Sequence, residues 1–157
     1  MKYILPILVI VLLLLFPQRV YCAQRLTISF IEYDGYGSHW FSQKEVPADS
    51  YLHLFARANA VLDYLFALDK PNIYAYPDGI QILRTHFLRG HLTVELYIPQ
   101  ASFGGTMLER IYLGQILKNL LGLDGVDRVS IIADTPEGLN VHEMCSWYEL
   151  FDGIIGI

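Results

Sequence analysis

The chain has 157 residues, 54% of them hydrophobic and 17% charged, with a formal net charge of −5 at pH 7. This length suits one domain, and the apolar content excludes an intrinsically disordered chain. Within residues 1–22 only Lys2 and Arg19 are charged, so the remainder is more acidic than the whole chain. Because phosphate neutralisation requires basic side chains on one face, this acidic body argues against nucleic acid as a partner.

Residues 1–22 have the pattern of a signal peptide. Lys2 precedes an apolar run over residues 3–16, which is ended by a proline. The run is shorter than the roughly 20 apolar residues that span a bilayer, and it suits the hydrophobic region of an export signal. We therefore expect an exported protein in the periplasm or another extracytoplasmic compartment, which would touch the membrane only if this segment stayed uncleaved as an anchor.

The expected cleavage after Cys22 makes Ala23 the first residue of the mature protein. Lipid attachment at Cys22 is disfavoured, because Tyr21 and Arg19 stand where a lipid-attachment motif has small and apolar residues. Loss of Cys22 leaves Cys145 without a second cysteine, so no disulfide within the chain would stabilise the fold. Residues 23–157 are therefore expected to form a single domain that depends on its hydrophobic core.

The first half of this domain predicts a hairpin followed by a helix. Residues 26–33 alternate as a strand with both faces fairly apolar, and residues 40–46 return as a short second strand. A helix is predicted over 51–68, with Ser50 as its N-cap and Pro71 beyond its end. Its apolar stripe consists of Leu54, Phe55, Ala58, Val61, Leu62, Leu65 and Phe66.

The second half predicts further strands around one more helix. Residues 80–87 and 91–98 alternate on either side of a turn at 88–90, which is typical of a hairpin with one buried face. Strands are also predicted at 126–133 and at 141–150, the latter at a sheet edge.

The second helix begins with a capping-box sequence. Thr106 and Glu109 have the spacing at which each side chain satisfies a free backbone N–H, and Gly122 suits a left-handed residue at the helix end. Together the elements predict an α+β fold. We expect a two-layer sandwich, with a mostly antiparallel sheet and two helices packed on one face.

No catalytic, cofactor-binding or metal-ligating set of residues is predicted. The segment His142–Cys145 resembles a fragment of a metal site, but Ser146 stands where a zincin helix requires its second histidine. His86 and His91 flank the hairpin turn, yet two imidazoles without a carboxylate or thiol make an incomplete metal site. We therefore expect no catalytic residue, no cofactor and no metal ion.

Aromatic residues are concentrated in predicted loops and near the end of the chain. Such side chains supply large contact area at modest entropic cost, which suits a contact surface for protein or glycan. The alternative, which composition favours slightly, is that they cover the second face of the sheet within the same chain. The candidate interaction surface consists of Tyr36, Trp40, Tyr74, Tyr76, Trp147 and Tyr148.

Several stretches follow one another in an order that is found in a known domain. Pro77–Ile80 places a proline and a glycine before the second hairpin, and Gly90–Leu96 reads glycine, x, leucine, x, valine, acid, leucine. Gln115–Leu120 then precedes a strand that ends at Asp134. With a first strand at Thr27–Tyr33, this order resembles the GerMN domain of spore-germination GerM-type proteins and other exported bacterial proteins.

The resemblance implies a non-enzymatic envelope domain that contacts other proteins. The matching positions are structural, and none is a catalytic residue. The chain carries one copy of the pattern, whereas the sporulation proteins that it resembles carry two in tandem. The family also commonly has a glycine after the strand-end aspartate, where this chain has Thr135.

The leading functional expectation is an exported, non-catalytic interaction module. Its partners would be envelope proteins of a sporulation- or germination-type assembly, further copies of the chain, or peptidoglycan-related proteins. The alternative is an envelope protein that binds a glycan or a small ligand through exposed aromatic residues. A hydrolase would require a histidine or an acid to be brought against Cys145.

Overall fold

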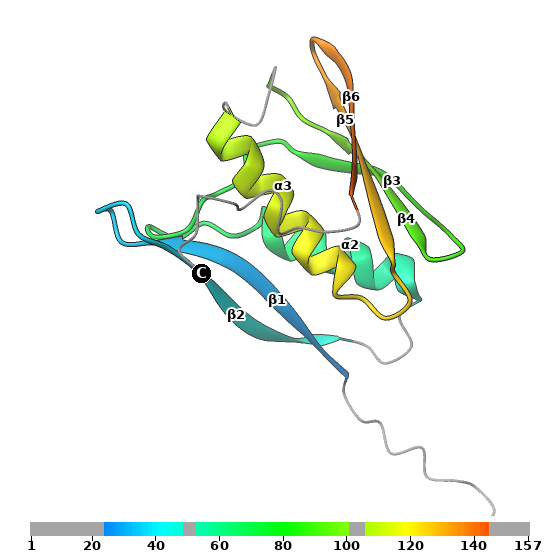
Figure 1. Ribbon diagram of the computed structural model, residues 1–157, viewed down its shortest axis with the longest axis horizontal. Coiled ribbons are helices and arrows are strands. Elements are labelled where there is room, and N and C mark those ends of the chain that lie inside the picture. Colours follow the sequence, from blue (N-terminus) through cyan, green and yellow to red (C-terminus); the bar gives the residue numbers. More distant parts are fainter. Residues whose placement is uncertain (1–23, 49–52, 101–105, 145–157) are drawn as a thin grey trace, which may run out of the picture.

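A computed structural model describes residues 24–48, 53–100 and 106–144 (Figure 1). The predicted signal peptide, Trp147 and Tyr148 lie outside these ranges. The α+β class predicted from the sequence is confirmed. In chain order the elements are β1 (Gln24–Tyr33), β2 (His39–Ala48), α2 (Leu54–Phe66), β3 (Gln81–Leu88), β4 (His91–Tyr97), α3 (Thr106–Leu121), β5 (Arg128–Thr135) and β6 (Gly138–Met144).

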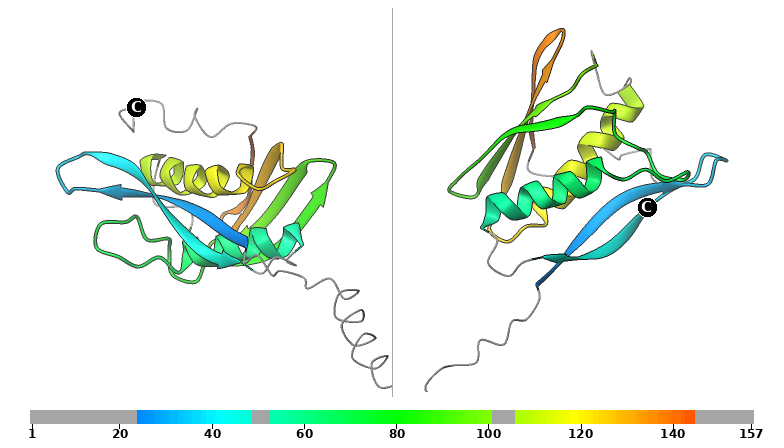
Figure 2. Two further views of the ribbon diagram at one scale, coloured as in Figure 1. Left: turned by 90° about the horizontal axis from the view of Figure 1, so that it is seen from below. Right: turned by 180° about the vertical axis from the view of Figure 1, so that it is seen from behind.

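The strands form two sheets. The hairpin β1–β2 is a two-stranded antiparallel sheet of its own, and the other strands form a sheet in the order β3-β4-β5-β6. Within this second sheet β4 and β5 are parallel, because the crossover through α3 returns the chain in the same direction. Figures 1 and 2 show both helices between the hairpin and the four-stranded sheet. The expectation of one sheet is thus corrected, since the first hairpin covers the helices from the opposite side.

The four-stranded sheet has the predicted buried face. In the β4–β5 pairing, Leu92 lies beside Val129, Val94 beside Ile131 and Leu96 beside Ala133, and all six side chains are buried. The strand β6 lies at one edge of this sheet, as the sequence predicted, although it begins earlier than the expected residue 141.

Helix α2 keeps most of its predicted stripe but has a different start. Ala58, Val61, Leu62 and Leu65 are buried, whereas Phe55 is exposed. The N-cap position is His53, which makes no side-chain capping bond, so the prediction of Ser50 as N-cap is wrong; Ser50 itself lies outside the described residues. None of the described helices is long and apolar enough to cross a membrane.

Helix α3 begins at Thr106 with Glu109 in its first turn, as predicted. The expected left-handed residue at Gly122 is wrong. The chain instead continues in right-handed turns, and the positive φ of 84° occurs at Gly125. The amide N–H of Leu123 donates to the carbonyl oxygen of Leu120 at 3.2 Å, which is the bond of a tight final turn.

Strand β1 packs against both helices, with one of its faces toward each. Lys44 of β2 pairs with Ile28, and its ammonium group lies 5.5 Å from the ring centre of Tyr64 in α2. The face of β1 that carries Ile28 is therefore directed toward α2. Phe41 of β2 pairs with Ile31, and the ammonium group of Lys118 in α3 lies 4.5 Å from the ring centre of Phe41. The face of β1 that carries Ile31 is therefore directed toward α3. Burial on both sides explains why both faces of this strand are apolar in the sequence.

The edge of β1 that β2 leaves open is closed by two side-chain amides of α3. The N–H of Ser29 donates to Oδ1 of Asn119 at 2.7 Å, and Nδ2 of Asn119 donates back to the carbonyl oxygen of Ser29 at 2.6 Å. The N–H of Ile31 donates to Oε1 of Gln115 at 2.7 Å. Both amides are buried. We call Gln115 and Asn119 the amide clamp.

Removal of the amide clamp should destabilise the fold. Asn119→Ala leaves both the N–H and the carbonyl group of Ser29 buried without a partner, which should lower the free energy of unfolding by about 3 kcal/mol. The control is Asn140→Ala, a change of the same chemistry at an exposed position of β6, which should alter stability by less than about 0.5 kcal/mol. Urea unfolding of both variants checks this; equal effects would show that the clamp contributes nothing specific.

The turn between β3 and β4 requires a left-handed glycine. Leu88 pairs with His91, so Arg89 and Gly90 form a two-residue turn, with φ angles of 50° and 80°. The carbonyl oxygen of Gly90 accepts the N–H of Asp127 at 2.8 Å, which fixes the turn to the segment before β5. A Cβ atom added at Gly90 would lie 2.3 Å from Oδ2 of Asp127.

Gly90→Ala should therefore be costlier than an alanine at another left-handed glycine. Gly125 has φ of 84°, and a Cβ atom added there would meet no atom within 4 Å, so Gly125→Ala should cost only the backbone strain, about 1 kcal/mol. Gly90→Ala should cost roughly 1 kcal/mol more, since the Asp127 carboxylate must move away. Chemical denaturation in an Asp127→Ala background is the decisive measurement: the extra cost should vanish there, and its persistence would contradict the contact.

Candidate functional site

The predicted aromatic surface is assembled only in part. Tyr36 is 95% exposed and Trp40 is 41% exposed, whereas Tyr74 is half-buried. Tyr76 is only 6% exposed and belongs to the core, where its hydroxyl donates to the carbonyl oxygen of Tyr112 at 3.0 Å. Burial also raises the pKa of Tyr76 well above its ordinary value of 10.0. Tyr76 is therefore removed from the candidate surface.

Asp34 fixes the turn that carries Tyr36. Its Oδ1 accepts the N–H of Tyr36 at 2.7 Å and the N–H of Ser38 at 3.1 Å. Such bonds from a short acidic side chain to its own following backbone define a tight turn. The N–H of Tyr36, followed by the bonds from Ser38, holds the pKa of Asp34 below its ordinary value of 3.8 despite an opposing effect of desolvation.

Three rings anchor one side of this hairpin to the loop after α2. The ring centres of Tyr33 and Tyr74 are 4.7 Å apart, and the ring of His39 stacks on Tyr74 at 5.7 Å. Nε2 of His39 lies 2.6 Å from the Tyr74 hydroxyl. The N–H of Tyr33 donates to the carbonyl oxygen of Asn72 at 3.0 Å. Desolvation, with a smaller contribution from Tyr33, raises the pKa of Tyr74 above 10.0.

Trp40 lies on the other side of the hairpin. Neighbouring residues of a strand point to opposite faces, so Trp40 points away from the face of His39. Its Nε1 donates to Oε2 of Glu32, the residue opposite it in the pairing, at 3.2 Å. Tyr36 at the apex and Trp40 beside it therefore remain available to solvent. We define these two side chains as the hairpin-tip surface.

Sequence reasoning did not identify His39 and Tyr33 as supports of this surface. Their pairing across the turn could have been inferred from the hairpin itself, but their contact with Tyr74 depends on tertiary structure. His86 and His91, which could have faced one another, do not: His86 lies opposite Thr93, and Nε2 of His91 is 2.8 Å from Oγ of Ser130. Among the described residues no group of three or more potential ligands could hold a metal ion.

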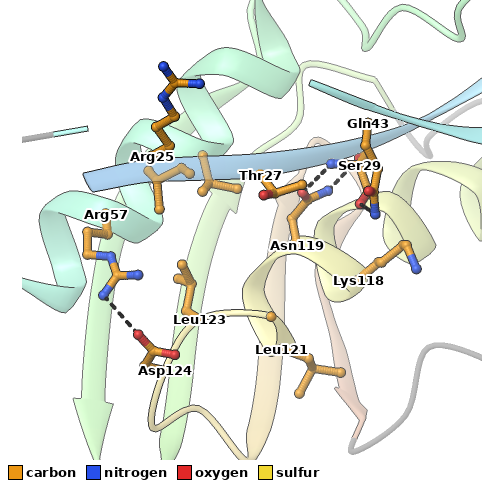
Figure 3. A pocket seen from close by; sticks show the side chains of 13 residues that line it. Arg25, Thr27, Ser29, Gln43, Arg57, Lys118, Asn119, Leu121, Leu123 and Asp124 are labelled. Atoms are coloured by element: carbon orange, nitrogen blue, oxygen red, sulfur yellow. Dashed lines mark hydrogen bonds and ion pairs between the residues drawn. The ribbon is translucent and has the colours of Figure 1, made fainter. Parts of the chain in front are cut away.

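A polar cavity of about 530 Å³ lies at the other end of the hairpin (Figure 3). Strand β1 contributes Thr27 and Ser29, helix α2 contributes Arg57, and the C-terminal end of α3 contributes Lys118 and Asn119. These residues are far apart in the sequence, so no local pattern predicts the cavity. Its volume falls within the range of roughly 300–1,000 Å³ that is typical of small-molecule sites.

The basic residues around this cavity differ in how they are satisfied. Arg25 pairs with Glu45 at 2.6 Å, and its guanidinium is exposed. Lys118 lies over the ring of Phe41, and desolvation lowers the pKa of its ammonium group from 10.5. The side chain of Arg57 is only 16% exposed, and it approaches Asp124 no closer than 3.7 Å.

Comparison with solved structures identifies this arrangement. The tandem GerMN domains of the sporulation protein GerM from Bacillus subtilis match 79% of the chain with a TM-score of 0.57 at 13% sequence identity. The fold is that of a GerMN domain. The matched region covers 45% of the GerM chain, so the present chain spans less than half of that tandem structure.

Other comparisons add little to the GerMN-like fold. A presumed lipoprotein from Clostridium perfringens matches 71% of this chain and 75% of its own at 12% identity, with a TM-score of 0.42. By sequence, the chain matches no known family profile and no curated protein. At these identities the likeness establishes the fold, and the working surface has to be argued from the residues of this chain.

The turn at Asp34 predicts a measurable titration. The amide NMR signals of Tyr36 and Ser38 should shift with a common midpoint below pH 3.8, because protonation weakens the two bonds that Asp34 accepts. Since the pKa is depressed in the folded state, this contribution to turn stability is present above the ordinary pKa and is lost as the pH falls through the folded one. Asp34→Asn is the control and should abolish this shift; its persistence would assign the titration to another group.

Proposed function

We propose that the protein is an exported, non-catalytic interaction module of the cell envelope. In this proposal it binds another envelope protein through the hairpin-tip surface, in an assembly of the sporulation or germination type. Support for a role of this kind comes from the GerMN-like fold, which also occurs in a sporulation protein. Export rests on the signal-peptide pattern of residues 1–22.

The observation that carries the proposal is the position of Tyr36. A tyrosine with 95% exposure gains nothing from burial within its own chain, yet the turn beneath it is fixed by two bonds to Asp34. Because the backbone of this turn is already fixed, a partner that covers the Tyr36 ring does not have to order the turn, which lowers the entropic cost of binding. Trp40 extends the same tip and is oriented by Glu32. Aromatic residues of this kind dominate the binding energy of many interfaces.

A second candidate function is the binding of a glycan at the same tip. The indole of Trp40 is held by the carboxylate of Glu32, and this combination of an aromatic ring with a hydrogen-bond acceptor suits a sugar ring. Self-association is a further proposal, since β2, β3 and β6 each lie at the edge of a sheet. A protein partner and a glycan would both use Tyr36 and Trp40, so the experiment has to identify the ligand as well as the surface that binds it.

The double variant Tyr36→Ala/Trp40→Ala should lose the partner while the fold remains intact. Tagged residues 23–157 would be cross-linked in an envelope extract and the captured proteins quantified by mass spectrometry. Loss of the two aromatic anchors should reduce capture of a specific protein by about tenfold or more, as expected for hot-spot residues. The matched control is Leu139→Ala/Val141→Ala, which removes two exposed apolar side chains from β6 and should leave capture unchanged.

Each outcome of this comparison has a defined meaning. Equal capture by both double variants would contradict a role for the hairpin-tip surface. Saturable quenching of tryptophan fluorescence by peptidoglycan fragments that is lost in Tyr36→Ala/Trp40→Ala, together with capture of no specific protein, would favour the glycan-binding alternative. Dimerisation that the β6 variant abolishes would instead assign the working surface to the sheet edge.

A further inference from the structure

We propose that the polar cavity beside β1 binds a small carboxylate ligand, whose charge pairs with Arg57. The ligand class is an organic acid that also carries hydroxyl or amide groups, as acidic sugars and acidic peptides do. This site lies at the end of the hairpin opposite Tyr36 and Trp40. It is therefore a separate site from the hairpin-tip surface, and it requires no particular partner protein.

The state of Arg57 is the first argument for an anionic ligand. Its side chain is largely buried, and its Nε–H is fully buried without a hydrogen-bond partner among the described residues. A buried charge is costly unless an opposite charge and hydrogen bonds compensate it. The ion pair with Asp124 compensates little, because the distance is 3.7 Å and the aspartate side chain is 86% exposed.

The charge of the lining is the second argument. Three basic residues, Arg25, Arg57 and Lys118, border the cavity, against one acid, Asp124. This positive excess occurs in a chain whose net charge is −5, so it contrasts with the surface as a whole. Figure 3 shows Arg57 and Asp124 at one side of the cavity and Lys118 at the other. An anion of a few atoms would therefore use Arg57, since Lys118 lies over Phe41 and Arg25 pairs with Glu45.

The uncharged part of the lining indicates the rest of the ligand. Between Arg57 and Lys118 the wall carries the side chains of Thr27, Ser29 and Gln43. The amide of Gln43 reaches only 3.4 Å from Oγ of Ser29, which is a long contact that a ligand could replace. A planar guanidinium matches a carboxylate in a two-bond arrangement, and neighbouring hydroxyl and amide groups match the polar atoms of a sugar or peptide. A purely apolar acid would leave these polar groups without partners.

Calorimetric titration of the protein with defined acids tests the site. The probes are glucuronate with glucose as its uncharged counterpart, and N-acetylglutamate with N-acetylglutaminamide as its counterpart. We expect saturable binding of at least one acid and none of its neutral counterpart, and the responding pair tells whether the source is a sugar acid or a peptide acid. Binding of neither acid, or equal binding of inorganic phosphate, would overturn the assignment of a carboxylate site.

Two variants and one control link the binding to Arg57. Arg57→Gln should lower the affinity for the responding acid by about tenfold or more, because a charge-assisted pair is lost. Asp124→Asn removes the competing carboxylate from an exposed loop and should raise the affinity for the same acid about two- to fivefold. Arg84→Gln, at an exposed arginine of β3, is the control and should change nothing. Weaker binding by Asp124→Asn would overturn the proposal even if Arg57→Gln failed to fold.

Discussion

The placement of the first hairpin depends on the hydrogen bonds that α3 supplies to β1. A strand edge packed against two helices would otherwise bury its free backbone groups at considerable cost. Residues four apart on a helix are separated by about 6 Å along its axis, and residues two apart on a strand by about 6.7 Å. This near match lets Gln115 and Asn119 reach the N–H groups of Ile31 and Ser29 together. The helix thereby takes the place of a neighbouring strand.

Both candidate sites follow from this clamp. It holds the middle of β1, so one end of the hairpin projects beyond the helices with Tyr36 at its apex, where Asp34 and the Tyr33–His39–Tyr74 cluster fix it. The other end of β1 passes Arg57 and the end of α3, and the polar cavity opens there.

The sequence predicted the elements well because their patterns are local. The period of two in residues 91–98 and the three-four spacing of α2 each depend on burial against one neighbouring surface. The apolar character of both faces of β1 is visible in the sequence, but the expected two-layer sandwich did not account for it, and the burial of both faces explains it. The clamp could not be foreseen, since its partners are separated by 84 and 90 positions and a buried Asn or Gln looks like any polar helix residue. For the same reason Tyr76 could not be distinguished from Tyr36: an aromatic residue in a loop is core or surface according to where the loop runs.

The amide clamp also connects the two sites through strand β1. Ser29 contributes its backbone to Asn119 and its side chain to the cavity wall, so a molecule held between Thr27 and Arg57 would contact the strand that carries the hairpin tip. A ligand shifts an equilibrium between two arrangements only by its difference in affinity for them, so any effect on the tip requires tighter binding when β1 is seated against α2 and α3 than when the hairpin is displaced. Such a ligand would restrict the orientation of the hairpin relative to the helices without changing the conformation of Tyr36 or Trp40. Coupling of this kind follows from a shared strand, and its size is bounded by the difference in affinity between the seated and the displaced hairpin.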